Sequence, residues 1–229
     1  MKTPVLTVER ISLPEDLGES LGPWQVAEGE LVLLVGRSPA EMNLLGDIIL
    51  GVTQPGKGEV TFRGKSWEAR SLSEDEALRR SVGRVYARDE GARWIENLEL
   101  DENVQLAQSF DPLESREHIE RRARELSGEL GLGELPKTRP AATEELIQQK
   151  AQWVRALLPD PLRLLILEEP LEGVPKEEQR PFLDVVRQRR KEGVAILWME
   201  ERNGRTWEEE LEPDRILGED LIPKTGTST

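Results

Sequence analysis

A strand-to-helix turn at Gly36 is the first place in this sequence where residue types and spacing could do chemistry. The apolar run Leu31–Val35 predicts a buried strand, and a phosphate-binding P-loop follows such a strand with glycine, four residues, glycine, lysine and serine or threonine. Only Gly36 fits this pattern, because Glu41, Met42 and Asn43 stand at its last three positions. On the motif alone, the segment is a turn with no nucleotide-binding role.

Composition restricts the other chemistry that the chain could perform. It has no cysteine, which excludes disulfides, thiolate metal sites and a cysteine nucleophile. Its single histidine, His118, lies in the charged run 114–124, where we expect a solvated helix face and not a ligand. Metal clusters with two or three histidines are excluded by count. The net charge of −14 disfavours a nucleic-acid partner, because phosphate backbones are bound by clustered lysine and arginine.

Three apolar runs predict the sheet that must position any site. Leu31–Val35, Leu162–Leu167 and Val194–Trp198 lack the alternation of a half-exposed sheet and are typical of buried parallel strands. The helical stretch Lys176–Lys191 separates the last two runs. Strand, helix and strand in this order form a βαβ unit, which predicts an α/β fold with a mostly parallel core sheet.

The segments around this core differ in character. Short β-like pieces at residues 6–8 and 24–26 and the alternating stretch Glu59–Gly64 predict an N-terminal antiparallel part, with the last of them at its edge. Residues 101–158 carry apolar positions at helical spacing, which predicts a helical subdomain inserted into the core. The small, polar stretch 213–229 predicts a frayed tail.

Several stretches resemble, in the right order, the nucleotide-binding subunits of ATP-binding-cassette (ABC) transporters. These stretches are Val26–Ser38, Leu44–Gly64, Asn97–Val104, Trp153–Leu158 and Leu164–Pro170. The resemblance covers about residues 5 to 202 and implies a P-loop NTPase-like ABC ATPase fold in a single domain. Its α/β core would span about residues 1–97 and 159–212, its helical subdomain about 98–158, and a tail 213–229.

The resemblance implies a degenerate nucleotide site. The positions equivalent to Walker A are Gly36, Arg37, Ser38, Met42, Asn43 and Leu44. Met42 replaces the family's phosphate-binding lysine, and Asn43 replaces its magnesium-binding hydroxyl. Glu41 places a negative charge beside the position of the phosphates. Two neighbouring acids are better preserved: Glu168 is the candidate magnesium ligand of Walker B, and Glu169 matches the family's catalytic base.

The remaining family positions have also lost their usual residues. The signature equivalent is Thr143, Glu144, Glu145, Leu146 and Ile147, so two carboxylates would face a triphosphate. Ala87 stands in place of the glutamine of the Q-loop, and Glu200 in place of the histidine of the H-loop. In the family, each nucleotide lies between Walker A of one subunit and the signature of the other. Pairing with an intact cassette would therefore leave both sites with one defective half.

Arginines and tryptophans near these positions have alternative interpretations. Arg37, Arg84 and Arg88 could bind an anion, but we expect them to be solvated. Trp153 and Trp198 lie on a predicted helix and a predicted strand, which favours core packing. Another aromatic residue, Trp94, follows the Q-loop equivalent, the region that contacts the permease in the family, and could serve there as an aromatic anchor in a groove.

The leading hypothesis is a pseudo-ATPase: a cassette subunit, with no required cofactor, docked on an integral-membrane permease. It would pair with a second cassette or with itself. One alternative is a divergent, active ATPase using ATP and magnesium; another is a soluble regulatory module. No apolar run is long enough for membrane insertion, and the sequence begins with no export signal. We therefore expect a cytoplasmic protein on the inner face of the membrane. A narrower resemblance of residues 94–98 and 152–156 to cassettes of mammalian-cell-entry systems suggests lipid transport.

Overall fold

The computed structural model describes residues 3–13, 21–88, 93–201 and 207–218. The elements in chain order are β1 (Pro4–Ser12), β2 (Trp24–Ala27), β3 (Leu31–Val35), α1 (Pro39–Ile49), β4 (Lys57–Phe62), β5 (Lys65–Ser66), α2 (Leu72–Arg79), β6 (Val82–Val85), α3 (Leu100–Ser109), α4 (Arg116–Glu129), α5 (Glu145–Leu157), β7 (Leu164–Glu168), α6 (Lys176–Lys191), β8 (Ala195–Glu200), α7 (Glu208–Leu211) and β9 (Arg215–Leu217). Within these ranges, a membrane-crossing helix is ruled out by the length and polarity of every helix.

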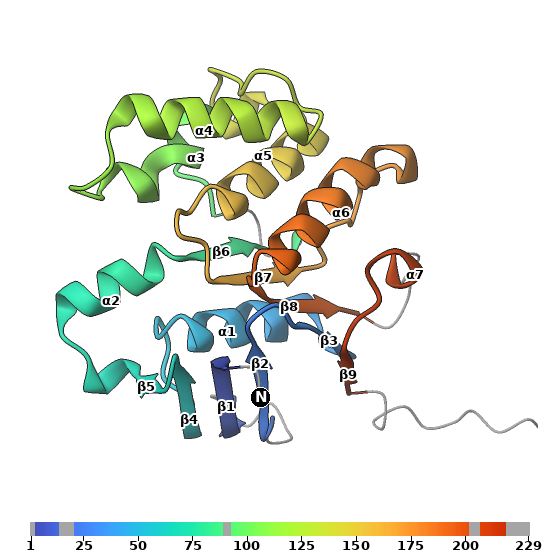
Figure 1. Cartoon of the computed structure of the whole chain (residues 1–229). Helices are drawn as coiled ribbons and strands as arrows, with labels where there is room; N and C mark the ends of the chain where they lie inside the picture. Colours follow the sequence, from blue (N-terminus) through green and yellow to red (C-terminus); the bar gives the residue numbers. More distant parts are fainter. Residues whose placement is uncertain (1–2, 14–20, 89–92, 202–206, 219–229) are drawn as a thin grey trace, which may run out of the picture.

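A five-stranded parallel sheet forms the centre of the molecule, in the order β6-β7-β8-β3-β9 (Figure 1). The three predicted buried strands are confirmed as β3, β7 and β8. Every residue of β3 and β7 is buried, because both faces of the sheet are covered. The expected frayed tail is wrong for Arg215–Leu217, which pair with β3 as strand β9. Residues 219–229 lie outside the described residues.

A second, antiparallel sheet has the order β2-β1-β4-β5. Its central strand β1 pairs with β2 on one side and with β4 on the other. The predicted strand at residues 59–64 is confirmed as β4, but its edge position is wrong. The edge belongs to the two-residue strand β5, which pairs with Thr61 and Phe62 and is too short for an alternation pattern to reveal.

The two faces of the parallel sheet are covered by different layers. Helix α1 lies between the two sheets and shares their apolar core, which includes Leu34 of β3 and Phe62 of β4 (Figure 1). The opposite face packs against α5 and α6 through residues such as Leu33 and Phe182. Helices α3, α4 and α5 form the expected helical part at one end of the molecule (Figure 1). The turn from β3 to α1 and the carboxyl end of β7 therefore meet at one edge of the sheet.

Candidate functional site

The turn between β3 and α1 contains the residues equivalent to Walker A. Gly36 has a φ of 81°, and its N–H donates to the backbone oxygen of Glu200 at 3.1 Å. Ser38 is the N-cap of α1, and Pro39 is the first helical residue, a position that proline favours because its missing N–H is not needed there. The helix thus begins inside the four-residue part of the P-loop pattern. From Pro39 onward, residues that would belong to a phosphate-binding loop instead form the first helical turn.

The Glu41 carboxylate occupies the N-terminus of α1. The Ser38 N–H and hydroxyl both donate to Glu41 Oε2 at 2.9 Å, and Arg37 Nη1 lies 3.2 Å from Glu41 Oε1. Burial raises the pKa of the Glu41 carboxyl, but the bonds from Ser38 and Arg37 lower it by more, so the group is ionised. A helix N-terminus is a ready anion site, and here the anion is a side chain of the same helix.

The next three residues of α1 point toward protein. Met42, at the lysine position, is fully buried in the core between the sheets. Leu44 is half-buried and packs against the same core. Asn43 is 9% exposed, and its Oδ1 accepts hydrogen bonds from Arg84 and Arg93, each at 3.0 Å.

Arg84 of β6 is the centre of this buried polar network. Its Nε donates to Glu168 Oε1 at 2.6 Å, its Nη1 to Asp47 Oδ1 at 2.6 Å, and its Nη2 to the backbone oxygen of Asn43 at 2.7 Å. The expectation of a solvated arginine is wrong here, because only 4% of the Arg84 side chain is exposed. Its partners lie 37 to 84 residues away in the chain, so no local pattern could indicate them.

The Walker B equivalent Glu168, the last residue of β7, is fully buried. Burial raises the pKa of its carboxyl, and the Arg84 guanidinium opposes that shift. Its Oε2 accepts the backbone N–H of Ala87 at 3.3 Å. The side chain of Ala87, at the Q-loop position, is buried and offers no hydrogen-bonding group.

Glu169, the candidate catalytic base, lies in a different environment. Its backbone has a φ of 43°, and its Oε1 accepts the backbone N–H of Glu201 at 3.2 Å. Burial raises the pKa of the Glu169 carboxyl to about 7, and the nearby charges of Glu172 and Glu200 contribute. Within the described residues, no salt bridge joins Glu169 to a basic group.

The H-loop equivalent Glu200 binds two tryptophans. Its Oε1 accepts the indole N–H of Trp198 at 2.7 Å and that of Trp207 at 3.1 Å. The two indoles stack with their ring centroids 3.9 Å apart. Core packing of Trp198 is confirmed, as is that of Trp153, which stacks on a phenylalanine of α6. Sequence reasoning missed Trp207 because a single aromatic residue in a charged stretch gives no periodic signal.

The signature equivalent lies at the start of α5. Glu144 is the N-cap without a side-chain capping bond, and Glu145 is the first helical residue. Glu145 forms a salt bridge with Arg88, while Thr143 Oγ1 lies 2.8 Å from the hydroxyl of Thr138. Leu146 and Ile147 are half-buried and pack against the core. A phosphate approaching this helix N-terminus would meet two carboxylates.

Trp94 is half-buried at the junction with the helical part. The Arg155 guanidinium lies 4.1 Å above its ring, and burial lowers the pKa of Arg155 to about 10. The buried Trp94 Nε1 has no hydrogen-bond partner within the part of the chain that the structure describes. Its neighbour Ile95 is 47% exposed. The half-buried Trp94 and the exposed Ile95 together form an apolar border that follows the Q-loop equivalent in the chain.

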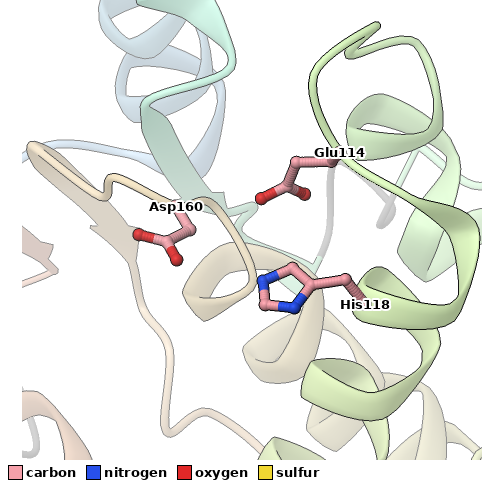
Figure 2. A group of neighbouring side chains, drawn as sticks. All are labelled: Glu114, His118 and Asp160. Carbon is pink, nitrogen blue, oxygen red and sulfur yellow. The ribbon is translucent and has the colours of Figure 1, made fainter.

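His118 lies in a small polar cluster away from this edge. Figure 2 shows its ring facing Glu114 and Asp160; one ligand atom from each lies within 4.8 Å of the others. Arg122 already bonds Glu114 at 2.6 Å, and Arg121 lies 2.6 Å from His118 Nδ1. A metal-bound imidazole normally donates its other N–H to an acceptor, whereas an arginine can only donate. The cluster is therefore a charge network and a poor metal site.

The fold and this edge define a class of protein. A P-loop-type nucleotide-binding cassette has a parallel sheet with a glycine turn after one strand and an acidic pair after another. An antiparallel sheet lies over one face of that parallel sheet, as it does here. A family model described as "ABC transporter" matches residues 23–172, more than half of the 229 residues. The chain belongs to the ABC transporter family.

Curated relatives come from bacteria and archaea. A ribose import ATP-binding protein, RbsA 1, of Rubrobacter xylanophilus is 29% identical over 77% of this chain and 34% of its own length. A methionine import ATP-binding protein, MetN, of Rhizobium johnstonii is 28% identical over 75% and 46%. The chain thus spans about a third to a half of these two relatives. An uncharacterized ABC transporter ATP-binding protein of Methanocaldococcus jannaschii is 25% identical over 76% and 75%.

Two solved structures share the fold. An ATP-binding subunit of an ABC transporter has a TM-score of 0.71 and 26% identity, over 86% of this chain and 80% of its own. A dimeric bacterial ABC transporter cassette has a TM-score of 0.70 and 20% identity, over 85% and 87%. The expected ABC ATPase fold is confirmed.

The family normally uses ATP and magnesium, and the residues of this chain do not fit them. A carboxylate stands at the N-terminus of α1, and a guanidinium bonds both Asn43 and Glu168, the equivalents of the family's metal-binding groups. The lysine position is buried as Met42.

Proposed function

We propose that this chain is a cassette subunit that docks on a membrane permease at the inner face of the cytoplasmic membrane and does not hydrolyse ATP. Relatives with import or export names, among them a macrolide export ATP-binding/permease protein of Wolinella succinogenes, support a role in transport. In this role the chain contributes shape and contacts to the complex. A second cassette or a second copy of the chain would complete the assembly.

One observation carries the proposed loss of hydrolysis. The Glu41 carboxylate accepts the N–H and the hydroxyl of Ser38 at the start of α1, where a phosphate would have to bind, and it is ionised. A triphosphate would have to displace this carboxylate and then lie beside it. Like charges at this distance repel, and no lysine is present at position 42 to compensate.

Nucleotide titration tests this part of the proposal. Purified chain with ATP and magnesium should show no micromolar binding by calorimetry and no phosphate release above a buffer control. The methionine import protein MetN, assayed in parallel, serves as the positive control. Micromolar binding with turnover that Glu169→Gln abolishes would overturn the proposal.

Docking on a permease uses the apolar border formed by Trp94 and Ile95. We expect the chain to co-purify with an integral-membrane permease from its native membranes, and Ile95→Asp to abolish this. Ile95 is the better residue to replace because Trp94 also packs against Arg155. Val52→Asp is the matched control, since Val52 is 60% exposed on the α1–β4 turn. Retained binding by the Ile95 variant would exclude this surface, and no co-purification at all would favour a regulatory module outside transport.

A divergent, active ATPase is the second candidate, and the raised pKa of Glu169 favours it. A carboxyl with a pKa of about 7 is well matched to accept a proton from water at neutral pH. Met42, Ala87 and Glu200 stand where the family has its lysine, glutamine and histidine, which argues against this role. The turnover assay decides between a subunit without hydrolysis and an active ATPase. Lipid as the cargo rests on the resemblance of residues 94–98 and 152–156 alone; analysis of lipids in the co-purified complex tests it.

A further inference from the structure

Three oxygen-bearing side chains gather around one cation at the edge of the sheet. Asn43 and Asp47 come from α1, and Glu168 comes from the end of β7. Carboxylate and amide oxygens in such a group are typical ligands of a divalent cation. The group at their centre is the Arg84 guanidinium, within 2.6 Å of both carboxylates and 3.0 Å from Asn43 Oδ1.

The charges of this cluster balance without an ion. Asp47 and Glu168 supply two negative charges, and Arg84 supplies one positive charge. The second comes from Arg93, whose Nη2 lies 3.0 Å from Asp47 Oδ2 and 3.0 Å from Asn43 Oδ1. A buried pair of carboxylates would be costly without such partners. The network therefore compensates both Asp47 and Glu168, the second of which is the acid that the family fold directs toward a metal.

The close approach of α1 is part of the same arrangement. A Cβ at Gly46 would come within 2.3 Å of Arg84 Nη2 and 2.5 Å of Glu168 Oε1. Only glycine leaves room for the guanidinium between the helix and the strand. Gly46 of α1 thus accommodates the Arg84 side chain.

We propose that Arg84 is a built-in replacement for a divalent cation, and that Arg84 and Arg93 hold α1, β6 and β7 together in every state of the chain. This inference rests on the proposed function, in which the site takes no magnesium nucleotide. Arg93 directly precedes Trp94, so the same ion pairs attach the proposed docking segment to α1. The docking surface then keeps its position without a ligand.

Removing the arginine should restore a metal site, which gives a test by gain of function. Arg84→Met leaves Asp47 and Glu168 undercompensated, and its affinity for Mn²⁺ should be at least tenfold tighter than that of the unmodified chain. Paramagnetic resonance of free Mn²⁺ measures the binding, and a rise of the melting temperature with Mn²⁺ confirms that the folded state binds it. Arg190→Met is the control, because Arg190 pairs with the single carboxylate Asp214. No gain in a folded Arg84→Met variant would overturn the inference.

A charge-matched variant covers the case in which Arg84→Met does not fold alone. Arg84→Met combined with Glu168→Gln removes one charge of each sign; it should fold and should not bind Mn²⁺. If Arg84→Met folds only when Mn²⁺ is added, the replacement is supported. If Mn²⁺ has no effect on it, the inference fails. ATP binding by the unmodified chain would contradict the proposed function separately, so the two failures are distinguishable.

Discussion

Two neighbouring glutamates at the end of β7 lie in opposite electrostatic environments. Glu168 is fully buried but bonded to Arg84, whereas Glu169 is half-buried beside two other acids. Burial alone raises the pKa of both carboxyls, and only Glu168 has a guanidinium that opposes it. Glu168 thus serves as a buried structural partner of Arg84, while Glu169 lies in an environment that suits proton exchange. Retention of an acidic pair is therefore not evidence of retained catalysis.

Glu168→Gln should give the largest effect, because it removes the charge that pairs with Arg84. It leaves Arg84 buried with one carboxylate fewer, and we expect a loss of about 2–3 kcal/mol in the free energy of unfolding. Urea denaturation followed by tryptophan fluorescence measures it. The same change at Glu169 is the control and should not destabilise the fold. Equal effects at the two positions would contradict the assigned difference.

Gly46→Ala tests the packing around the Arg84–Glu168 pair and leaves every charge in place. The added methyl would clash with the Arg84 guanidinium, and we expect a loss of about 1–3 kcal/mol. Gly128→Ala in α4 is the matched control. A Cβ there would meet no atom within 4 Å apart from the backbone of its own helix, so about 0.5–1 kcal/mol of helix propensity should be gained. Thermal unfolding of both variants should shift in opposite directions. A shift of the same sign would argue against the tight fit.

Glu41→Ala extends the comparison to a third carboxylate, which is kept ionised by hydrogen bonds. It removes the bonds that the Glu41 carboxylate accepts from Ser38 but keeps the bond from the residue 41 N–H to Ser38 Oγ, and it should cost about 1 kcal/mol. Glu74→Ala in α2 is the reference, because Ser71 and Glu74 form the same capping box on a solvent-exposed helix. Chemical denaturation compares the two. Similar losses are expected at the two positions, and no loss at Glu41 would contradict its role in the capping box.

Glu169→Gln should have the smallest effect and should appear only in the pH dependence. The carboxyl titrates near 4.5 in the unfolded chain and near 7 in the folded one, so the folded state binds the proton more tightly. Its stabilising contribution is complete below pH 4.5 and is lost as the pH rises to 7. The variant should lose this slope and exceed the unmodified chain by about 1 kcal/mol or less at pH 8, since the group is half exposed. Melting temperatures from pH 4.5 to 8 check it; parallel curves would refute the raised pKa.

Local patterns predicted the elements of the fold well, and the polar connections of the site poorly. The strand Leu31–Val35 and the helix Lys176–Lys191 have the bounds that the sequence predicts. Burial on both faces of a strand leaves a continuous apolar run, and burial of one helix face leaves a periodic pattern. Strand β9 has only three residues, one of them charged, and left no such record. The role of Arg84 was hidden because its partners come from two distant elements. A side chain's charge is visible in a sequence, but its counter-charge is not.

Strand β9 has a consequence for handling the protein. It covers the outer side of β3, a strand of five consecutive apolar residues. A chain cut before Arg215 would leave the backbone N–H and C=O groups of β3 open along that side. An apolar strand with an uncovered edge is a template for pairing with other chains. By covering this edge, the three residues of β9 should protect the protein from aggregation.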